Sequence, residues 1–291
     1  MNEIEVELGP TQETLLIPLL GRAMETKKGG RLLSDPKAVE IVESLDYDFS
    51  KWGSSARGVC IRARIFDGQV RRFLAAHPRG TIVEIGAGLN TRFERLDNGQ
   101  AQWFELDLPD SMTLRRRFFE DHERRTMHAG SVLDSDWLDA VAELPGPYCF
   151  VSEAVVIYLD SPDVQRAMQA IATRFPGAWL VMDTTPTKAV QLQGKNALMK
   201  VMSKDSWFRW ACDDPAALQS WGLVLDQSVS FADVAPDIRK DMPWPLRLIF
   251  GLTPRSLLRS MGGGYRMNQF TLKAPSDAGK RSIEEERSRR A

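Results

Sequence analysis

A glycine-containing turn between two short apolar stretches constrains the fold of this chain more than any other feature. The stretch 82–85 leads into Gly86-Ala87-Gly88, and a second stretch, 103–106, ends at Asp107. In doubly wound α/β sheets, a strand followed by paired glycines and a helix opens the ligand crevice, because glycine lets a ligand approach the backbone closely. The sequence therefore predicts an α/β fold whose crevice binds an adenine nucleoside.

The spacing of acidic residues around this turn bears on the identity of the ligand. Asp107 follows Gly88 by roughly 20 residues, which lets a carboxylate at the end of the next strand reach the ribose hydroxyls of NAD or of S-adenosylmethionine. The dinucleotide fingerprint has a third glycine where this chain has Thr91. Glu84, two residues before Gly86, disfavours a pyrophosphate and suits a sulfonium and an α-ammonium group. We therefore favour S-adenosylmethionine, and an NAD-dependent oxidoreductase is the alternative.

Strand-length apolar stretches alternate with helix-length segments along most of the chain. Strands are predicted over 82–85, 102–106, 126–129, 148–152 and 178–183. This alternation indicates a mostly parallel sheet. Two further strands, over 223–231 and 266–273 with the last antiparallel, would complete the seven-stranded, Rossmann-like sheet of a class I methyltransferase.

The whole of residues 1–275 is predicted to form a single S-adenosylmethionine-dependent methyltransferase domain. Residues 1–58 would form an N-terminal helical cover, in which Asp35 caps a helix with Pro36 in its first turn. Residues 186–222 have the length of an inserted helical cap. The tail over 276–291 is polar and of mixed charge, and we expect it to be disordered.

Charge and cysteine content exclude several classes of partner. The chain has 38 Lys and Arg against 39 Asp and Glu, so it offers no electrostatic footprint for nucleic acid or for an anionic membrane. Cys60, Cys149 and Cys212 lack paired spacing, so we expect neither disulfides nor a metal site. No secretion signal or membrane anchor is expected. The prediction is a cytoplasmic monomer or homodimer.

A series of motifs, taken in order, resembles a known family. They are Asp35-Pro36-x-Ala38, Asp46-Tyr47-Asp48-Phe49, Arg62-x-Arg64-x-x-Asp67, Gly86-Ala87-Gly88-Leu89-x-Thr91-Arg92-Phe93-x-Arg95-Leu96, Phe104-x-Leu106-Asp107-Leu108-Pro109 and Glu153-Ala154-Val155-x-x-Tyr158-Leu159. With these motifs the chain resembles the leucine carboxyl methyltransferase superfamily over roughly residues 11–275, and within it the bacterial branch similar to the tetracenomycin polyketide synthesis O-methyltransferase. The resemblance implies O-methylation of a small molecule, such as a polyketide-like intermediate of secondary metabolism.

The resemblance also implies which residues bind the donor. Arg62 would pair with the methionine carboxylate, Asp107 would hold the ribose, and Glu153 would face the α-amino group. The stretch 131–134 would flank the adenine, and Arg22 matches a basic position that approaches the carboxylate in some members. The predicted donor-binding set is Arg62, Glu84, Gly86, Ala87, Gly88, Asp107, Leu108, Ser131, Val132, Glu153 and Ala154.

Two positions depart from the family pattern. Ala154 stands where the family often has a glycine after the glutamate, and Asn90 stands where it often has an aspartate in the glycine loop. The additional methyl group would narrow the pocket slightly, and the asparagine removes one charge. Donor binding is expected to survive both changes.

The chemistry of methyl transfer narrows the choice of acceptor. The reaction is an in-line displacement that depends on alignment and on exclusion of water, so no catalytic residue is predicted. A carboxylate needs no general base, whereas a phenol with a pKa near ~10 benefits from one. His77 lies in a helix-to-strand turn, and we expect His122 and His128 at the entry of the third strand, opposite the crevice. We therefore favour a carboxylate acceptor. A phenolic acceptor and a donor-binding regulatory protein without a cavity beside the cap are the alternatives.

Five residues are candidates for contact with the acceptor: Arg22, Arg57, Tyr158, Trp207 and Arg266. Arg57 and Arg266 suit an acceptor carboxylate because arginine makes bidentate pairs with carboxylates, although ordinary ion pairs also explain them. Trp207 would line an apolar pocket for a planar acceptor, with packing in the cap as the competing interpretation.

Overall fold

The computed structural model describes residues 4–195, 197–242, 244, 247–248, 252–253 and 264–274. The tail predicted over 276–291 and the end of the predicted domain at residue 275 lie outside these residues. Within the described part, no helix has the length and apolar character needed to cross a membrane.

Seven strands form one sheet in the order β5-β4-β3-β6-β7-β9-β8. The strands are β3 (Thr81–Ile85), β4 (Gln102–Asp107), β5 (Arg125–Ala129), β6 (Tyr148–Ser152), β7 (Trp179–Thr184), β8 (Leu223–Ser230) and β9 (Arg266–Leu272). Neighbours among the first five pair in parallel, and β9 is antiparallel to both β7 and β8. The predicted seven-stranded α/β sheet of a class I methyltransferase, with the last strand antiparallel, is confirmed.

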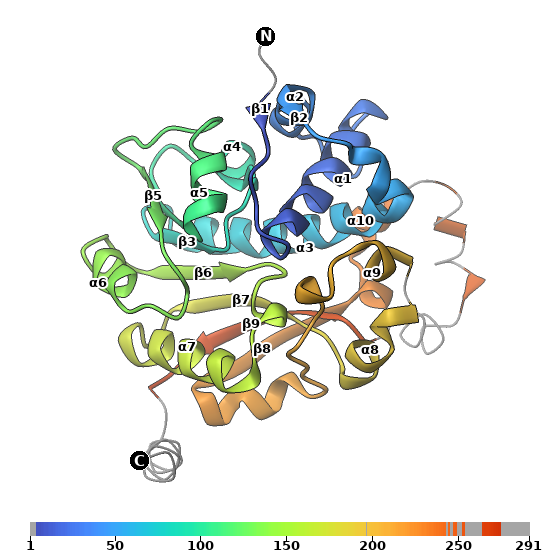
Figure 1. The fold of residues 1–291 in the computed structure, drawn as a ribbon. Coiled ribbons are helices and arrows are strands. Elements are labelled where there is room, and N and C mark those ends of the chain that lie inside the picture. The colour runs from blue at the N-terminus through green and yellow to red at the C-terminus, as the bar shows by residue number, and fades with distance from the viewer. Residues whose placement is uncertain are drawn as a thin grey trace.

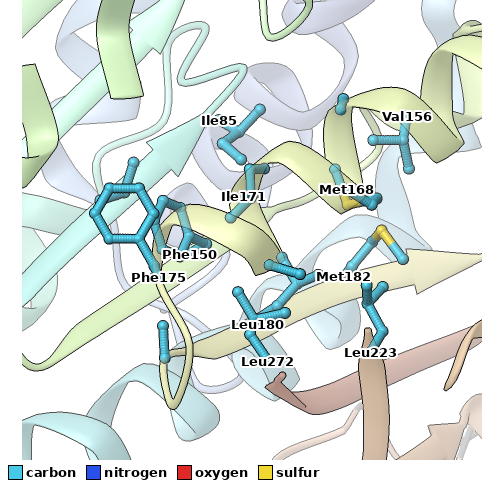
Figure 2. Close-up of a cluster of buried hydrophobic side chains, with 14 of the residues drawn as sticks. Ile85, Phe150, Val156, Met168, Ile171, Phe175, Leu180, Met182, Leu223 and Leu272 are labelled. Atoms are coloured by element: carbon cyan, nitrogen blue, oxygen red, sulfur yellow. The ribbon is translucent and has the colours of Figure 1, made fainter. Parts of the chain in front are cut away.

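Helices cover both faces of this sheet because its central strands are apolar on both sides. On one face, Phe66, Val70 and Phe73 of α3 (Arg57–Ala76) pack against residues such as Ile82. On the other face, α6 (Asp136–Ala142) and α7 (Ser161–Arg174) cover residues such as Phe150. Figure 2 shows Met168 and Ile171 of α7 directed toward the side chains of the strands beneath them.

The N-terminal segment forms a helical layer at one end of the molecule, with α1 and α2 at the top of the view (Figure 1). Its elements are β1 (Ile4–Glu5), η1 (Gln12–Leu15), α1 (Leu16–Lys27), α2 (Pro36–Ser44), β2 (Leu45–Asp46) and η2 (Phe49–Ala56). The predicted cap is confirmed, because the Asp35 carboxylate accepts a hydrogen bond from the backbone N–H of Ala38 at 3.0 Å. The short parallel pair of β1 and β2 was not predicted.

The segment after β7 consists of several short helices, with α8 and α9 on the right of Figure 1. They are α8 (Thr187–Leu192), η4 (Gln193–Lys195), α9 (Ala197–Val201), η5 (Lys204–Ser206) and η6 (Pro215–Trp221). Met199 and Met202 from this segment pack with Ile17, Leu20 and Trp52 of the N-terminal layer. The two segments therefore share one apolar cluster, although they are far apart in the sequence.

The remaining helices connect the strands. They are α4 (Arg92–Leu96), α5 (Pro109–Arg115), η3 (Val156–Tyr158), η7 (Phe231–Asp233) and α10 (Pro236–Asp241). Helix α5 begins at Pro109, because proline suits the first helical position, where a missing N–H costs nothing.

Candidate active site

A cavity of about 510 Å³ lies at the carboxyl ends of β3, β4 and β6. Open α/β sheets bind ligands at this edge, at the point where the strand order reverses direction. All eleven residues of the predicted donor-binding set line the cavity. Its remaining walls come from the N-terminal layer, the start of α3, the segment after β7 and residues next to β8 and β9.

The glycine turn forms the floor of this cavity in a conformation that other residues adopt only with strain. Gly86 and Gly88 have φ values of 68° and 47°. A Cβ atom added at Gly86 would lie 2.3 Å from Cγ2 of Val155. Glycine is therefore required there both for its backbone angles and for the close approach of the loop after β6.

Asp107 ends β4 with its side chain turned back toward the glycine turn. One carboxylate oxygen accepts the N–H of Gly88 at 2.6 Å, and the other accepts the N–H of Leu108 at 2.7 Å. Burial raises the pKa of Asp107 above its usual value, although these two backbone donors oppose the shift. Each oxygen keeps a further lone pair, so the carboxylate is able to accept two hydroxyl groups.

Arg62 and Glu153 meet across the cavity from α3 and from the loop after β6. The Arg62 Nε atom lies 2.8 Å from the Glu153 carboxylate, and both side chains are largely buried. Burial alone would raise the pKa of Glu153, but Arg62 and Arg92 outweigh it and lower the pKa. The site therefore contains an ionised carboxylate beside a guanidinium.

Arg92 lies at the centre of a buried ion-pair network that was not predicted. Its guanidinium contacts Asp67 at 2.9 Å, Glu84 at 2.6 Å and Glu153 at 2.6 Å, and its side chain is 1% exposed. Both Glu84 oxygens accept hydrogen bonds from Arg92, and burial raises the pKa of Glu84 against the opposing effect of that guanidinium. An attraction between Glu84 and a ligand cation stays a prediction. The clue to the network was present in the sequence, since Asp67 and Arg92 both belong to the family motifs.

Arg22 links the N-terminal layer to the glycine turn. Its guanidinium donates to the Asp35 carboxylate at 2.8 Å and to the carbonyl oxygen of Leu89 at 2.7 Å. Thr91 also donates to Asp35. The polar contacts of Arg22 are thus made to the protein itself. They attach α1 to the glycine turn, so this early helix forms part of the cavity wall.

Ala154 adopts the left-handed conformation, with a φ of 57°. Its N–H points at the Asp183 carboxylate, 3.0 Å from each oxygen. This geometry explains why the family often has glycine here, since a side chain in this region costs energy. Asn90, the other departure, lines the cavity, and its side-chain oxygen accepts a long hydrogen bond of 3.5 Å from Arg95.

The wall opposite the glycine turn is largely apolar and aromatic. Its members include Met199, Met202, Tyr158, Phe208, Phe231 and Tyr265. The rings of Tyr158 and Phe208 meet edge to face at 5.5 Å, and those of Phe231 and Tyr265 stack at 5.8 Å. A cavity therefore extends under the segment after β7, the feature expected of an enzyme and not of an occluded scaffold.

Two of the predicted acceptor contacts lie away from the cavity lining. Trp207 donates its indole N–H to the carbonyl oxygen of Met199 at 3.2 Å and packs within the helical segment, as the competing interpretation held. Arg266 begins β9, opposite Thr184 and Ser230. Arg22 and Tyr158 do line the cavity. Arg57 begins α3, and its side chain lies outside the described part of the structure.

A buried pair of acidic groups beside the cavity was also missed. Asp183, near the end of β7, is fully buried and accepts a hydrogen bond from the Tyr265 hydroxyl. Burial raises the pKa of Asp183 to about 7, against the opposing effect of Arg62. An aspartate near the carboxyl end of a predicted strand, as with Asp107, was the available signal.

None of the three histidines lines the cavity. His128 was expected at the entry of its strand, but it lies one residue before the carboxyl end of β5 and stacks on Phe104 at 5.5 Å. The placement was wrong because His128 belongs to the strand itself, which covers Arg125–Ala129 and matches the predicted range 126–129 within one residue. His122 does precede the strand, as predicted.

Curated relatives of this chain are methyltransferases. Tetracenomycin polyketide synthesis O-methyltransferase TcmP of Streptomyces glaucescens is 28% identical over 234 residues, which cover 78% of this chain and 86% of the relative. The S-adenosyl-L-methionine-dependent methyltransferase dpfgK of Gibberella zeae is 24% identical over 242 residues, 76% of this chain and 81% of the relative.

Solved structures agree on the fold. A DUF574 family protein from Streptomyces avermitilis superposes with a TM-score of 0.55 at 13% identity, covering 87% of this chain and 97% of that protein. The family model for leucine carboxyl methyltransferase matches residues 16–172, more than half of the chain. This match includes α1 and α2 of the N-terminal layer, the glycine turn, Asp107 and Glu153. The chain therefore belongs to the leucine carboxyl methyltransferase family.

Proposed function

We propose that this protein is an O-methyltransferase that esterifies a carboxylate of a small, largely apolar molecule. The methyl donor is S-adenosylmethionine, and S-adenosylhomocysteine is the product. The observation that carries the proposal is the convergence of Asp107, Arg62 and Glu153 on one cavity above the glycine turn.

The charges of the site support this donor. Arg62 would bind the methionine carboxylate, and Glu153 would bind the α-ammonium group. Each member of the existing ion pair would then face a ligand group of opposite charge. Asp107 would accept the two ribose hydroxyls with its remaining lone pairs. Ser131 and Val132 would flank the adenine. When bound, the donor supplies an electrophilic methyl carbon next to the aromatic wall.

The aromatic wall supports an apolar acceptor of the polyketide kind that the name of TcmP mentions. Such side chains bind a planar molecule and exclude water, and alignment with water exclusion is the main requirement of this displacement. A carboxylate oxygen is already nucleophilic and needs no base, and no histidine lines the cavity. A phenolic acceptor is the second candidate, because Tyr265 and Asp183 are placed to accept a proton.

Calorimetric titration with S-adenosylhomocysteine tests donor binding. The Asp107→Ala variant should bind at least about 100-fold more weakly, since two hydrogen bonds to a charged group contribute about 1.5–3 kcal/mol each. Asp139→Asn is the matched control, an exposed aspartate on α6 away from the cavity. Wild-type protein that binds NADH and not S-adenosylhomocysteine would overturn the proposal.

A transfer assay tests the acceptor. Purified protein with labelled donor is offered 2-naphthoic acid, 2-naphthol and larger tricyclic acids and phenols. Label recovered as a base-labile ester supports the carboxylate proposal, and label recovered as a stable ether supports the second candidate. Tight donor binding with no transfer to any member of the panel would favour a regulatory protein.

A further inference from the structure

The hydroxyl of Tyr265 joins the cavity to the carboxylate of Asp183, which contacts no arginine directly within the described residues. Tyr265 lines the cavity, and its hydroxyl donates to Asp183 while accepting a 3.4 Å hydrogen bond from Nη1 of Arg62. Phe231 stacks on the Tyr265 ring and holds it in place. In the described part of the chain, the donors to Asp183 are neutral: the Tyr265 hydroxyl, the N–H of Ala154 and its own N–H.

The cations that line the cavity are already paired. Among the described side chains of the lining, only Arg22 and Arg62 are positively charged, and they contact Asp35 and Glu153 respectively. The methionine end of the donor would also compete for Arg62. An acceptor carboxylate must therefore be held largely by neutral donors, since a buried charge without hydrogen bonds is costly.

Resting on the function proposed above, we propose that Tyr265 donates a hydrogen bond to the acceptor carboxylate, and that a proton taken up by Asp183 turns the Tyr265 hydroxyl toward it. Tyr265 is then a substrate-binding residue, and Asp183 is a positioning residue that acts through it. Tyr265 therefore recognises the acceptor oxygen, and protonation of Asp183 makes the Tyr265 hydrogen available for that contact.

The hydrogen-bonding capacity of a phenol explains why the proton matters. A hydroxyl oxygen has one hydrogen and two lone pairs. With Asp183 ionised, the Tyr265 hydrogen points at Asp183, as in the structure. With Asp183 protonated, Asp183 and Arg62 donate to the two lone pairs, and the hydrogen is free to point into the cavity.

The charged and titratable groups around Asp183 make this proton available near neutral pH. They are Arg62 from α3, Glu153 from the loop after β6, Tyr158 from η3 and Tyr265 before β9. Burial raises the pKa of Asp183 to about 7, and a carboxylate bound nearby would raise it further by repulsion.

The step balances without a co-reactant. One proton from solvent binds Asp183 as the acceptor carboxylate enters. An oxygen lone pair of the carboxylate then forms the bond to the methyl carbon, and the electrons of the breaking carbon–sulfur bond go to sulfur. The neutral ester leaves, and Asp183 returns its proton to solvent.

The test is the pH profile of kcat/KM with 2-naphthoate as acceptor. For the wild type we expect a plateau at low pH and a fall above about pH 7 that approaches tenfold per pH unit. Asp183→Asn, which keeps a permanent donor toward Tyr265, should give a profile with no fall above about pH 7. Tyr265→Phe should lose about tenfold or more and also show no fall. Tyr148→Phe, whose hydroxyl bonds the carbonyl oxygen of Leu144 outside the cavity lining, is the control.

The opposite profile would overturn the proposal. A kcat/KM that rises with pH and is abolished in Asp183→Asn would mean that the pair acts as a base for a hydroxyl acceptor. A wild-type profile reproduced in Asp183→Asn would remove Asp183 from the reaction while leaving the methyltransferase function intact.

A second measurement does not depend on turnover of 2-naphthoate. Carbon-13 NMR of aspartate carboxyl groups, in protein saturated with S-adenosylhomocysteine, should show one group that titrates between about pH 6 and 8 and is missing from Asp183→Asn. Absence of such a group would overturn the proposal, whereas failure of S-adenosylhomocysteine to bind would overturn the function itself. Thermal melts confirm that each variant is folded.

Discussion

Substitution of Gly86 by alanine should destabilise the protein more than the same change at another glycine with positive φ. The left-handed backbone at 68° costs a residue with a side chain about 1–2 kcal/mol. The added Cβ also lies 2.3 Å from Cγ2 of Val155. That distance forces the loop after β6 to move, and such overpacking costs about 1–3 kcal/mol. The expected loss of unfolding free energy is about 2–5 kcal/mol.

Gly177 provides a control that separates the two contributions. Its φ is 87°, and an added Cβ would meet no atom within 4 Å. Gly177→Ala should therefore lose only the backbone part, about 1–2 kcal/mol. Val155→Ala should partly rescue Gly86→Ala, because it removes the atoms that the new methyl group meets.

Urea unfolding followed by tryptophan fluorescence measures these losses, and calorimetry with S-adenosylhomocysteine measures their effect on the site. Gly86→Ala should also weaken donor binding, since the turn and the loop that carries Glu153 would move apart. The reasoning is refuted if Gly86→Ala loses no more stability than Gly177→Ala, or if the Val155→Ala change is simply additive with it.

Three further outcomes follow from the same structure. Ala154→Gly should raise the unfolding free energy by about 0.5–1 kcal/mol in urea melts, because relief of the left-handed strain exceeds the entropy that glycine adds to the unfolded chain. Arg92→Met should lower it by about 3–5 kcal/mol by leaving the buried Glu84 carboxylate without its arginine partner, whereas Arg166→Met, at an exposed pair, should change it by less than about 1 kcal/mol. Burial opposes ionisation of Asp67, but Arg95 and Arg92 prevail and lower its pKa to about 2. Its contribution to stability is therefore present above the ordinary aspartate pKa of 3.8 and lost as the pH falls toward about 2, and acid unfolding curves of Asp67→Asn should lack that part of the decline.

The strand pattern and the residues that line the cavity above the glycine turn could be predicted from the sequence because each depends on local chemistry. Apolar stretches bounded by turn residues specify the strands, and parallel strands bring their carboxyl ends to one edge. Gly86, Asp107 and Glu153 follow such strands directly, so their convergence could be predicted without knowledge of side-chain packing.

The partners of the charged residues could not be predicted in this way. Glu84 precedes Arg92 by eight positions and was interpreted as a ligand contact, but the first turn of α4 brings the guanidinium back onto it. Trp207 was predicted to line an apolar pocket, yet its indole N–H donates to a backbone carbonyl oxygen within its own segment. The motifs contain Arg92 but do not specify that it contacts Glu84, and no pattern in the sequence specifies the hydrogen bond of Trp207.

By itself, then, the sequence determined the seven-stranded α/β fold, its family and the edge of the sheet at which the donor site lies, because glycine angles, strand ends and apolar alternation act over a few residues. Tertiary structure alone decided that Arg62 meets Glu153, that Arg92 contacts three carboxylates and that Tyr265 reaches Asp183. Those contacts join residues up to 91 positions apart. They depend on how helices and loops pack across the sheet, because a buried charge is costly unless that packing brings an opposite charge or a hydrogen-bonding group into contact with it.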